Sequence, residues 1–245
     1  MIDPINIELA SYASWPALEQ INYFGWILRF ANGHSKRANS VNPLTPMNAK
    51  LPAMIRYCES FYRERSQSTI FRLLSFVDNS TLDCYLALSK YVYIDPSLVL
   101  YQKLDSIYNH SVSLIATDWE SWVRTYCEIA GSNLIAQKNH IKILSLVPSP
   151  CLFAVLEESG QAVACGLGVV YDSYFGIFDI VTRLQARNKG HGTRLLTDML
   201  SWARQTGAQH AYVQVMAQNA SAIHLYEKLG YRRIYDYWYR IIRET

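Results

Sequence analysis

The chain has 245 residues, of which 50% are hydrophobic and 18% are charged. This composition excludes a disordered protein and is sufficient for one large or two small domains, each with a sizeable core. The formal net charge of +3 is too small to indicate a nucleic-acid-binding protein.

Five cysteines are scattered along the chain, odd in number and without a C-x-x-C pair. This pattern argues against a disulfide framework and a zinc site, and we expect no metal. The expected location is a reducing cytoplasm. All five cysteines are expected to be buried apolar residues: Cys58, Cys84, Cys127, Cys151 and Cys165.

No targeting or membrane segment is expected. The N-terminus carries Asp3 and Glu8, without a basic segment that leads into an apolar run, so a signal peptide is not expected. The longest apolar stretch, Ala162–Tyr171, is too short to span a bilayer.

Strand and helix patterns alternate over the first part of the chain. Strands are expected at Asn6–Ala10, Trp26–Phe30, Arg37–Val41, Thr69–Val77 and Leu98–Tyr101. Helices are expected at Pro16–Tyr23, Leu51–Arg65 and Thr81–Lys90. A turn is expected at Asn32-Gly33, because both residues favour turns.

A linker is expected around Leu104–His110. After it, strands are expected at Ser111–Ala116, Cys151–Leu156 and Gln161–Tyr171, the last two joined as a hairpin around Glu158-Ser159-Gly160. Helices are expected at Asp118–Ala130, with Thr117 or Asp118 as its cap and Gly131 near its end, and at Leu134–Leu146.

The stretch Ile177–Gly192 has the pattern of a strand, a tight basic loop and the start of a helix. The loop, Arg187–Gly192, reads R-x-x-G-x-G. Apolar residues then recur with the period of a helix that buries one face: Leu195, Leu196, Met199, Leu200 and Ala203.

Such a loop is suited to bind an anion. Gly190 and Gly192 allow positive φ and a close approach of the backbone to a ligand. The first N–H groups of a helix lack intrahelical partners, and the helix dipole, Arg187 and Lys189 add positive potential. We therefore expect a phosphate or pyrophosphate ligand, although such a loop is also a common tight connection. It matches neither a Walker loop nor the complete dinucleotide fingerprint.

A strand is expected next at Ala211–Met216, then a short helix capped by Asn219 or Ser221 and ended by Gly230, and a final strand at Arg232–Ile242. From Asn219 to Tyr231 the chain reads N-x-x-A-x-x-L-Y-x-x-x-G-Y. Together with the R-x-x-G-x-G loop, this motif resembles the GNAT superfamily of acyl-CoA-dependent N-acetyltransferases. The resemblance is close over roughly the last 75 residues and holds as a pattern of elements over about residues 111–245.

The resemblance implies an α/β GNAT fold, acetyl-CoA as co-substrate and a set of site residues. The strand before the loop, which splays from its neighbour in this family, would pair with the pantetheine arm, and Asn219 matches the asparagine beside that arm. The residues expected to bind acetyl-CoA are Ile180, Val181, Thr182, Arg187, Asn188, Lys189, Gly190, His191, Gly192, Thr193 and Asn219.

Tyr226 matches the family tyrosine that protonates the leaving thiolate, a role that suits a phenol. The alternative is a tyrosine that only packs in the core. The general base is open: Asp179 is one candidate, Glu157 and Glu158 are weaker ones, and water is another. We expect His191 to face solvent within the loop and His224 to lie on a helix surface.

An offset of 140 residues places Asn79 on Asn219, Tyr91 on Tyr231 and Val41 on Val181, with strand on strand and helix on helix. This correspondence suggests two GNAT-like halves, residues 1–104 and 105–245, although an unrelated N-terminal α/β domain is the alternative.

The first half lacks the binding chemistry of the second. Arg187, Gly190, Gly192 and Tyr226 correspond to Met47, Lys50, Pro52 and Leu86. Proline cannot donate an N–H to a phosphate, so we expect no CoA site there.

The predicted function is acetyl transfer from acetyl-CoA to a primary amine, in a tandem GNAT-like α/β protein. The acceptor, a small molecule or a protein amine, and the oligomeric state stay open, because acceptor loops differ widely on one fold. The alternative is a CoA-binding protein that serves sensing or assembly without turnover.

Overall fold

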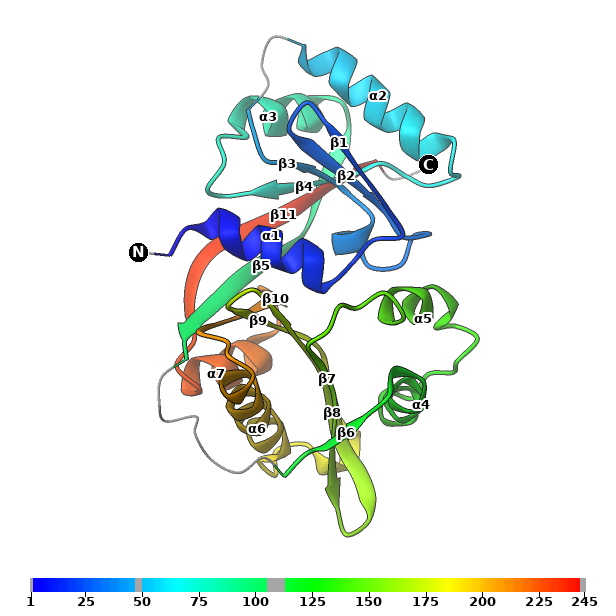
Figure 1. Ribbon diagram of the computed structural model, residues 1–245. Coiled ribbons are helices and arrows are strands. Elements are labelled where there is room, and N and C mark those ends of the chain that lie inside the picture. Colours follow the sequence, from blue (N-terminus) through cyan, green and yellow to red (C-terminus); the bar gives the residue numbers. More distant parts are fainter. Residues whose placement is uncertain (1, 47–49, 105–112, 243–245) are drawn as a thin grey trace. The chain divides into compact units, whose positions relative to one another are not determined.

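The computed structural model describes residues 2–46, 50–104 and 113–242 (Figure 1). These residues form two compact units. Unit 1 comprises residues 1–15, 100–214 and 219–232, and unit 2 comprises residues 16–99, 215–218 and 233–245. None of the described helices is long and apolar enough to cross a membrane.

In unit 1 the strand order is β10-β9-β8-β7-β6. Its strands are β6 (Ile115–Thr117), β7 (Cys151–Glu158), β8 (Gln161–Tyr171), β9 (Tyr174–Thr182) and β10 (His210–Met216). Neighbours from β6 to β9 are antiparallel, whereas β9 and β10 are parallel. The predicted hairpin of β7 and β8 is confirmed.

Helices cover both faces of this sheet (Figure 1). They are α1 (Pro4–Ser14), α4 (Trp119–Ala130), α5 (Lys138–Leu144), α6 (His191–Gln205) and α7 (Ala220–Lys228). Asp118 caps α4 by accepting a 2.7 Å hydrogen bond from the Ser121 N–H, and Gly131 ends the helix with φ 67°. The predicted apolar face of α6 is confirmed, since all five of its residues are buried.

In unit 2, which holds most of β5, the strand order is β1-β2-β3-β4-β11-β5. Its strands are β1 (Glu19–Tyr23), β2 (Trp26–Phe30), β3 (Val41–Pro43), β4 (Ile70–Leu74), β5 (Tyr91–Lys103) and β11 (Arg232–Ile242). Side chains of α2 (Leu51–Arg63) and α3 (Ser80–Leu88) pack on β2, β3 and β4 in one apolar core that includes Trp26, Tyr62 and Phe71.

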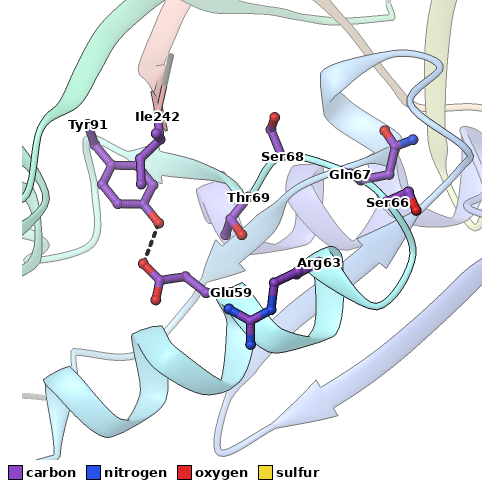
Figure 2. Close-up of a pocket in the computed structure, with 8 residues that line it drawn as sticks. All are labelled: Glu59, Arg63, Ser66, Gln67, Ser68, Thr69, Tyr91 and Ile242. Carbon is purple, nitrogen blue, oxygen red and sulfur yellow. Dashed lines mark hydrogen bonds between the residues drawn. The ribbon is translucent and has the colours of Figure 1, made fainter. Parts of the chain in front are cut away.

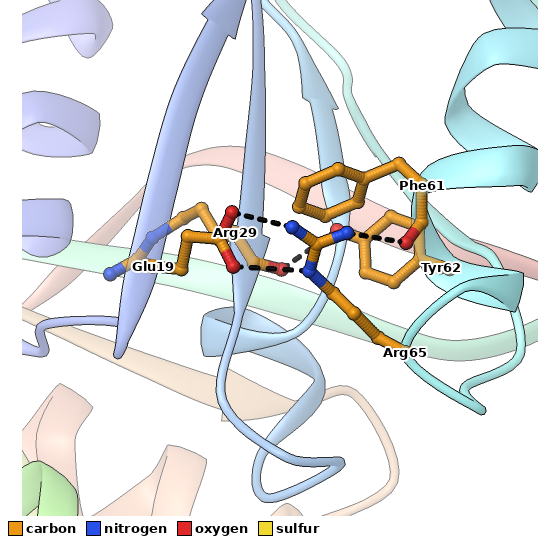
Figure 3. Close-up of polar contacts among 5 residues, drawn as sticks. All are labelled: Glu19, Arg29, Phe61, Tyr62 and Arg65. Atoms are coloured by element: carbon orange, nitrogen blue, oxygen red, sulfur yellow. Dashed lines mark hydrogen bonds and ion pairs between the residues drawn. The ribbon is translucent and has the colours of Figure 1, made fainter.

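A polar contact joins the end of α2 to the first strand of unit 2 (Figure 3). The Arg65 guanidinium donates to both oxygens of Glu19, at 2.7 and 3.0 Å, and to the Phe61 carbonyl at 2.9 Å. The buried Tyr62 hydroxyl donates to the Arg29 carbonyl at 2.7 Å. Because Arg65 and Glu19 are partly exposed, the ion pair orients α2 more than it stabilises it.

The terminal elements lie with the unit that is distant in sequence. Helix α1 packs on β8 and β9 of unit 1, and β11 pairs antiparallel with β4 of unit 2, from Tyr237↔Leu74 to Ile241↔Ile70. The expected boundary between residues 104 and 105 borders residues 105–112, which lie outside the described residues, as do Met47 and part of the predicted linker. That division stays a prediction.

The element boundaries follow the predicted offset of 140 residues. Helix α2 begins at residue 51 and α6 at residue 191. Helix α3 spans residues 80–88 and α7 spans residues 220–228. Strands β4 and β10 begin at residues 70 and 210. The correspondence thus extends from sequence to the starts of helices and strands.

Several predicted elements near the N-terminus are wrong. Asn6–Ala10 lies within α1 instead of a strand, because Asp3 accepts a hydrogen bond from the Ile5 N–H and Pro4 begins the helix. Pro16–Tyr23 is not a helix, because Phe24 and Gly25 adopt positive φ and turn β1 into a hairpin with β2.

Other predictions differ in extent. The predicted strand Arg37–Val41 overlaps a short 3₁₀ turn, Lys36–Ala38, before β3. The predicted helix Leu134–Leu146 is limited to α5, because a turn occupies the residues before Lys138. Among the cysteines, Cys84 is exposed and Cys151 is partly exposed, which corrects the expectation that all five are buried.

Asp83 on α3 holds β11 in unit 2. Its carboxylate accepts hydrogen bonds from Arg240 at 2.8 and 2.9 Å and from the Trp238 indole at 2.9 Å. Burial raises the pKa of Asp83, but the hydrogen bonds from Arg240 and Trp238 and the Arg240 charge lower it further, so the net shift is downward.

We predict that Asp83→Asn lowers the free energy of unfolding by about 1–2 kcal/mol at pH 7, a modest value because the pair is partly exposed. Since the folded-state pKa is lowered, the contribution of Asp83 is full above its unfolded pKa and is lost as the pH falls through the folded one. Denaturant unfolding at pH 7 and at acid pH measures both effects.

Asp236→Asn is the control, because Asp236 pairs with the exposed Arg233 and should change stability by less than about 0.5 kcal/mol. Equal losses in the two variants would contradict the role of Asp83.

Candidate functional site

The loop that opens α6 has the geometry of an anion cradle. Asn188 and Gly190 adopt positive φ, at 61° and 84°. The first intrahelical bond runs from the Arg194 N–H to the Gly190 carbonyl, at 3.0 Å. The N–H groups of residues 191–193 therefore have no acceptor within the helix and point out of its positive end.

The two loop glycines serve different purposes. A Cβ on Gly190 would meet nothing within 4 Å, so its positive φ is what requires glycine there. Gly192 has no positive φ, but its Cβ would lie 3.3 Å from Leu225 Cδ2 and 3.7 Å from Thr182 Oγ1. The start of α6 thus packs closely against both α7 and the end of β9.

The basic residues of the loop are exposed, and its histidine is not. Arg187 donates to the Thr182 carbonyl at 3.2 Å, and Lys189 is exposed. His191 is only 6% exposed, with Nε2 3.4 Å from a Glu158 carboxylate oxygen. The prediction that His191 faces solvent is wrong, because its position in the first turn of α6 directs the ring beneath the β7–β8 turn.

Strand β9 leaves regular pairing on both sides near its end. Two residues, Asp179 and Ile180, lie opposite Gly166 of β8, and Asp179 has φ 49°. This is a β-bulge, and a Cβ on Gly166 would collide with the Ile180 side chain. Among the described residues, the parallel pairing of β9 with β10 extends only from Tyr174 to Ile177. The edge of β9 that follows is open toward β10.

Asn219 and Tyr226 lie on α7. Asn219 Oδ1 accepts a 3.2 Å hydrogen bond from the Ala222 N–H, which confirms Asn219 as the cap. Tyr226 is 5% exposed, and its ring packs edge-on against Tyr231 at 5.6 Å. Since the neighbouring Leu225 approaches Gly192, α7 is fixed against the loop. His224 is exposed on α7, as predicted.

A buried histidine accompanies Asp179 and was not singled out by the sequence. His140 Nε2 lies 2.8 Å from Asp179 Oδ2, and Nδ1 lies 3.1 Å from Gln137 Oε1. Nothing in the spacing of residues 140 and 179 relates them. Nearby, burial and then the Asp179 charge raise the pKa of Tyr126 to about 12.

The weaker candidates lie elsewhere. Glu157 and Glu158 are exposed at the end of β7, and Glu158 faces His191 rather than the bulge. Within the described ranges, no group of three or more metal-ligating side chains comes together.

Among the described residues, the start of α2 does not repeat the backbone geometry of the loop before α6. Lys50, the residue before α2, has φ −126°, and Pro52 occupies the first turn. Leu86, which corresponds to Tyr226, is fully buried. The sequence-based contrast between the two halves therefore appears in backbone geometry as well.

Unit 2 contains a separate pocket of about 460 Å³ (Figure 2). It lies at the other end of α2 from Lys50, and the Tyr91 hydroxyl donates to Glu59 across it at 2.9 Å. Its lining is Glu59, Arg63, Ser66, Gln67, Ser68, Thr69, Tyr91 and Ile242. None of the predicted site residues contributes to it.

Comparisons with known proteins identify the family of this chain. Residues 5–240 match the family model described as "Probable histone acetyltransferase Rv0428c C-terminal". The uncharacterized N-acetyltransferase YobR of Bacillus subtilis (strain 168) is 30% identical over 253 residues, which cover 99% of this chain and 100% of that protein.

Solved structures show the same fold. A GCN5-related N-acetyltransferase from Kribbella flavida has a TM-score of 0.70 at 13% identity, covering 98% of this chain and 95% of that one. A tandem GNAT protein from the clavulanic acid biosynthesis pathway has a TM-score of 0.63 at 11% identity, covering 99% and 89%.

The family match, the relative and the fold together define an acyltransferase of the GNAT type, as the sequence predicts. The chain belongs to the GNAT N-acetyltransferase family described by that model.

We predict that Gly190→Ala and Gly207→Ala each lower the free energy of unfolding by about 1–2 kcal/mol. Both glycines have positive φ, and a Cβ on either would meet no neighbouring atom. They stand at opposite ends of α6. Each substitution therefore adds only the cost of holding an alanine in the left-handed backbone conformation. Urea unfolding measures the loss. A neutral Gly190→Ala beside a destabilised Gly207→Ala would show that the loop is not held in the left-handed conformation.

Proposed function

We propose that the second half of the chain binds acetyl-CoA and transfers its acetyl group to a primary amine. The observation that supports this most is the open edge of β9 beside the positive-φ loop of α6. An anion cradle at a helix start and unpaired strand backbone suit a ligand with a pyrophosphate at one end and an amide-containing arm at the other.

The residues that would hold acetyl-CoA are those predicted from the sequence. The N–H groups of Asn188 to Thr193 would bind the pyrophosphate, with Arg187 and Lys189 adding charge. Residues 179–182 run over about 10 Å from the bulge toward the loop. Their backbone would pair with the pantetheine arm of acetyl-CoA. Asn219, which caps α7, would lie beside that arm.

The chain would assist the reaction in three places. The backbone N–H groups of Ile180–Thr182 would polarise the acetyl carbonyl as an oxyanion hole does. Asp179 would take one proton from the acceptor ammonium, and Tyr226 would give one to the departing thiolate.

The protons balance as follows. The free amine forms a C–N bond to the acetyl carbon and the C–S bond breaks. The new amide nitrogen loses a second proton, which returns through solvent to the Tyr226 oxygen that protonated the thiolate. An ammonium and acetyl-CoA thus yield an acetamide, CoA thiol and one proton, which passes from Asp179 to solvent.

We also propose that the two halves are repeats, and that the first half does not bind CoA. The shared offset of 140 residues at the helix starts supports a repeat, and Lys50 and Pro52 argue against a cradle in the first copy. The first half would then shape or support the acceptor side of the protein.

The acceptor class is decided by experiment. A small amine and a protein lysine are both compatible with the site, since the family description names histone acetylation for a relative only. A mass-spectrometric screen of amines with acetyl-CoA would identify the acceptor.

Titration calorimetry with acetyl-CoA should find one site per chain. We predict that Gly190→Ala weakens binding at least tenfold, about 1.4 kcal/mol, because the loop N–H groups lose their arrangement. Gly207→Ala, with the same backbone cost at the other end of α6, should bind like wild type. Two equivalent sites, or the same affinity in all three proteins, would overturn the proposal.

Tyr226→Phe should retain the affinity for acetyl-CoA, because the ring still packs against Tyr231. We predict that kcat falls by about 10²–10⁴-fold, as expected when an acid acting in the transition state is removed. Leu86→Phe, at the corresponding position of the first half, should leave kcat unchanged. Full activity of Tyr226→Phe on a confirmed acceptor would assign the proton donation to water or another group.

A further inference from the structure

His140 occupies a position that a purely apolar side chain would be expected to fill. It is 2% exposed on α5, a short helix whose other buried residues are Ile143 and Leu144. A buried imidazole must have its polar atoms satisfied, since desolvation without a partner is costly. Its placement is therefore informative about what it contacts.

Both ring nitrogens of His140 face oxygen atoms. Nδ1 lies 3.1 Å from Gln137 Oε1, and Nε2 lies 2.8 Å from Asp179 Oδ2. The Gln137 amide also donates to Ser132 Oγ at 3.4 Å, which holds this amide in place. Because each ring nitrogen has a polar partner, the ring of His140 is fixed in one orientation.

Aromatic side chains enclose the ring of His140. Trp15 lies 5.7 Å away between ring centroids, Tyr126 packs edge-on at 5.5 Å and Trp122 at 6.5 Å. Trp15 also stacks on Phe178, the residue before Asp179, at 5.3 Å. Since these rings exclude water, the contact between His140 and Asp179 is stronger than the same contact at the surface.

Asp179 differs from its partner in exposure. Its side chain is 18% exposed, against 2% for His140. Among the described residues, its carboxylate makes one hydrogen bond, through Oδ2, so Oδ1 is left for a ligand. The residue also has φ 49° at the bulge, directly before the open edge of β9. Such strain persists only where surrounding contacts hold the residue in place.

We propose that His140 is a positioning residue for acetyl transfer, which holds the Asp179 carboxylate at the β9 bulge so that its second oxygen receives the acceptor amine. This role rests on the proposed function. In the step, Asp179 Oδ1 accepts one proton from the acceptor ammonium, whose nitrogen pair then forms the C–N bond as the C–S bond breaks. Tyr226 supplies the thiolate proton and recovers a proton, through solvent, when the new amide nitrogen loses its second one. His140 exchanges no proton with the substrates.

Variants at position 140 separate positioning from packing. His140→Gln can still present an N–H toward Asp179, whereas His140→Leu cannot. Ile143→Ala is the matched control, because it opens a cavity at a buried position of the same helix and removes no hydrogen-bonding group. The probe amines are putrescine, glucosamine, benzylamine and a lysine-containing tetrapeptide, and the amine acetylated fastest by wild type is used for all variants.

The expected result is a division between kcat and binding. His140→Leu should lower kcat at least about tenfold while the calorimetric affinity for acetyl-CoA is retained. His140→Gln should recover kcat to within about threefold of wild type, and Ile143→Ala should lose stability but not kcat at 25 °C. Equal kcat in His140→Leu and wild type, or equal losses in His140→Leu and Ile143→Ala, would overturn the inference.

Failure of the proposed function gives a different result. If wild type acetylates none of the probe amines, the assignment of a primary amine acceptor fails, and the role of His140 fails with it. If wild type acetylates an amine but the position-140 variants behave alike, only the inference fails.

A second measurement does not depend on activity. In protein labelled with [¹⁵N]histidine, the signals of His140 are assigned from their absence in His140→Gln. Asp179→Asn should move these signals and leave those of His191 unchanged, because His191 faces Glu158. Unchanged His140 signals in Asp179→Asn would show that the two side chains do not share a proton, and would overturn the inference.

Discussion

The site depends on the point at which β9 stops pairing with β10. Backbone N–H and C=O groups must be satisfied, so a strand that leaves its neighbour exposes groups that a ligand can use. Here the pairing ends at Ile177, the bulge at Asp179 turns the chain, and the loop that follows opens α6 with positive φ at Gly190. The open edge of β9, the bulge at Asp179 and the loop before α6 thus follow one another within a short segment of the chain.

The start of α2 differs from the start of α6, although the elements of the two halves begin at matching positions. In α2 the first turn contains Pro52, which has no N–H, and the preceding Lys50 does not adopt positive φ. Tyr226 is likewise replaced by the buried Leu86. These differences support the proposal that the two halves are repeats and that only the second binds the co-substrate. The pairing of β11 with β4 places the last strand in unit 2, where Asp83 fixes it through Arg240.

The sequence predicts those parts of the molecule that local patterns determine. Three features could be predicted because each depends on residues that are neighbours in the chain. They are the apolar period of α6, the cap at Asn219 and the glycine-containing loop before α6. Two predicted elements near the N-terminus were wrong. The residue pattern there fitted both a helix and a strand, and the turn at Phe24 uses a residue type that rarely adopts positive φ. The contact of His140 with Asp179 and the partner of β11 were not predictable, since both depend on tertiary packing between segments distant in the chain.

The central claim is that one half of a repeated scaffold holds the co-substrate. Hydrogen–deuterium exchange with and without acetyl-CoA tests it directly, because ligand contacts slow the exchange of backbone N–H groups. The account predicts new protection from exchange in residues 179–193 and 219–226. It predicts none in residues 39–46 and 50–53, the first-half positions that correspond to residues 179–193. Protection of the first-half segment to a similar degree, or no protection of residues 179–193, would contradict it.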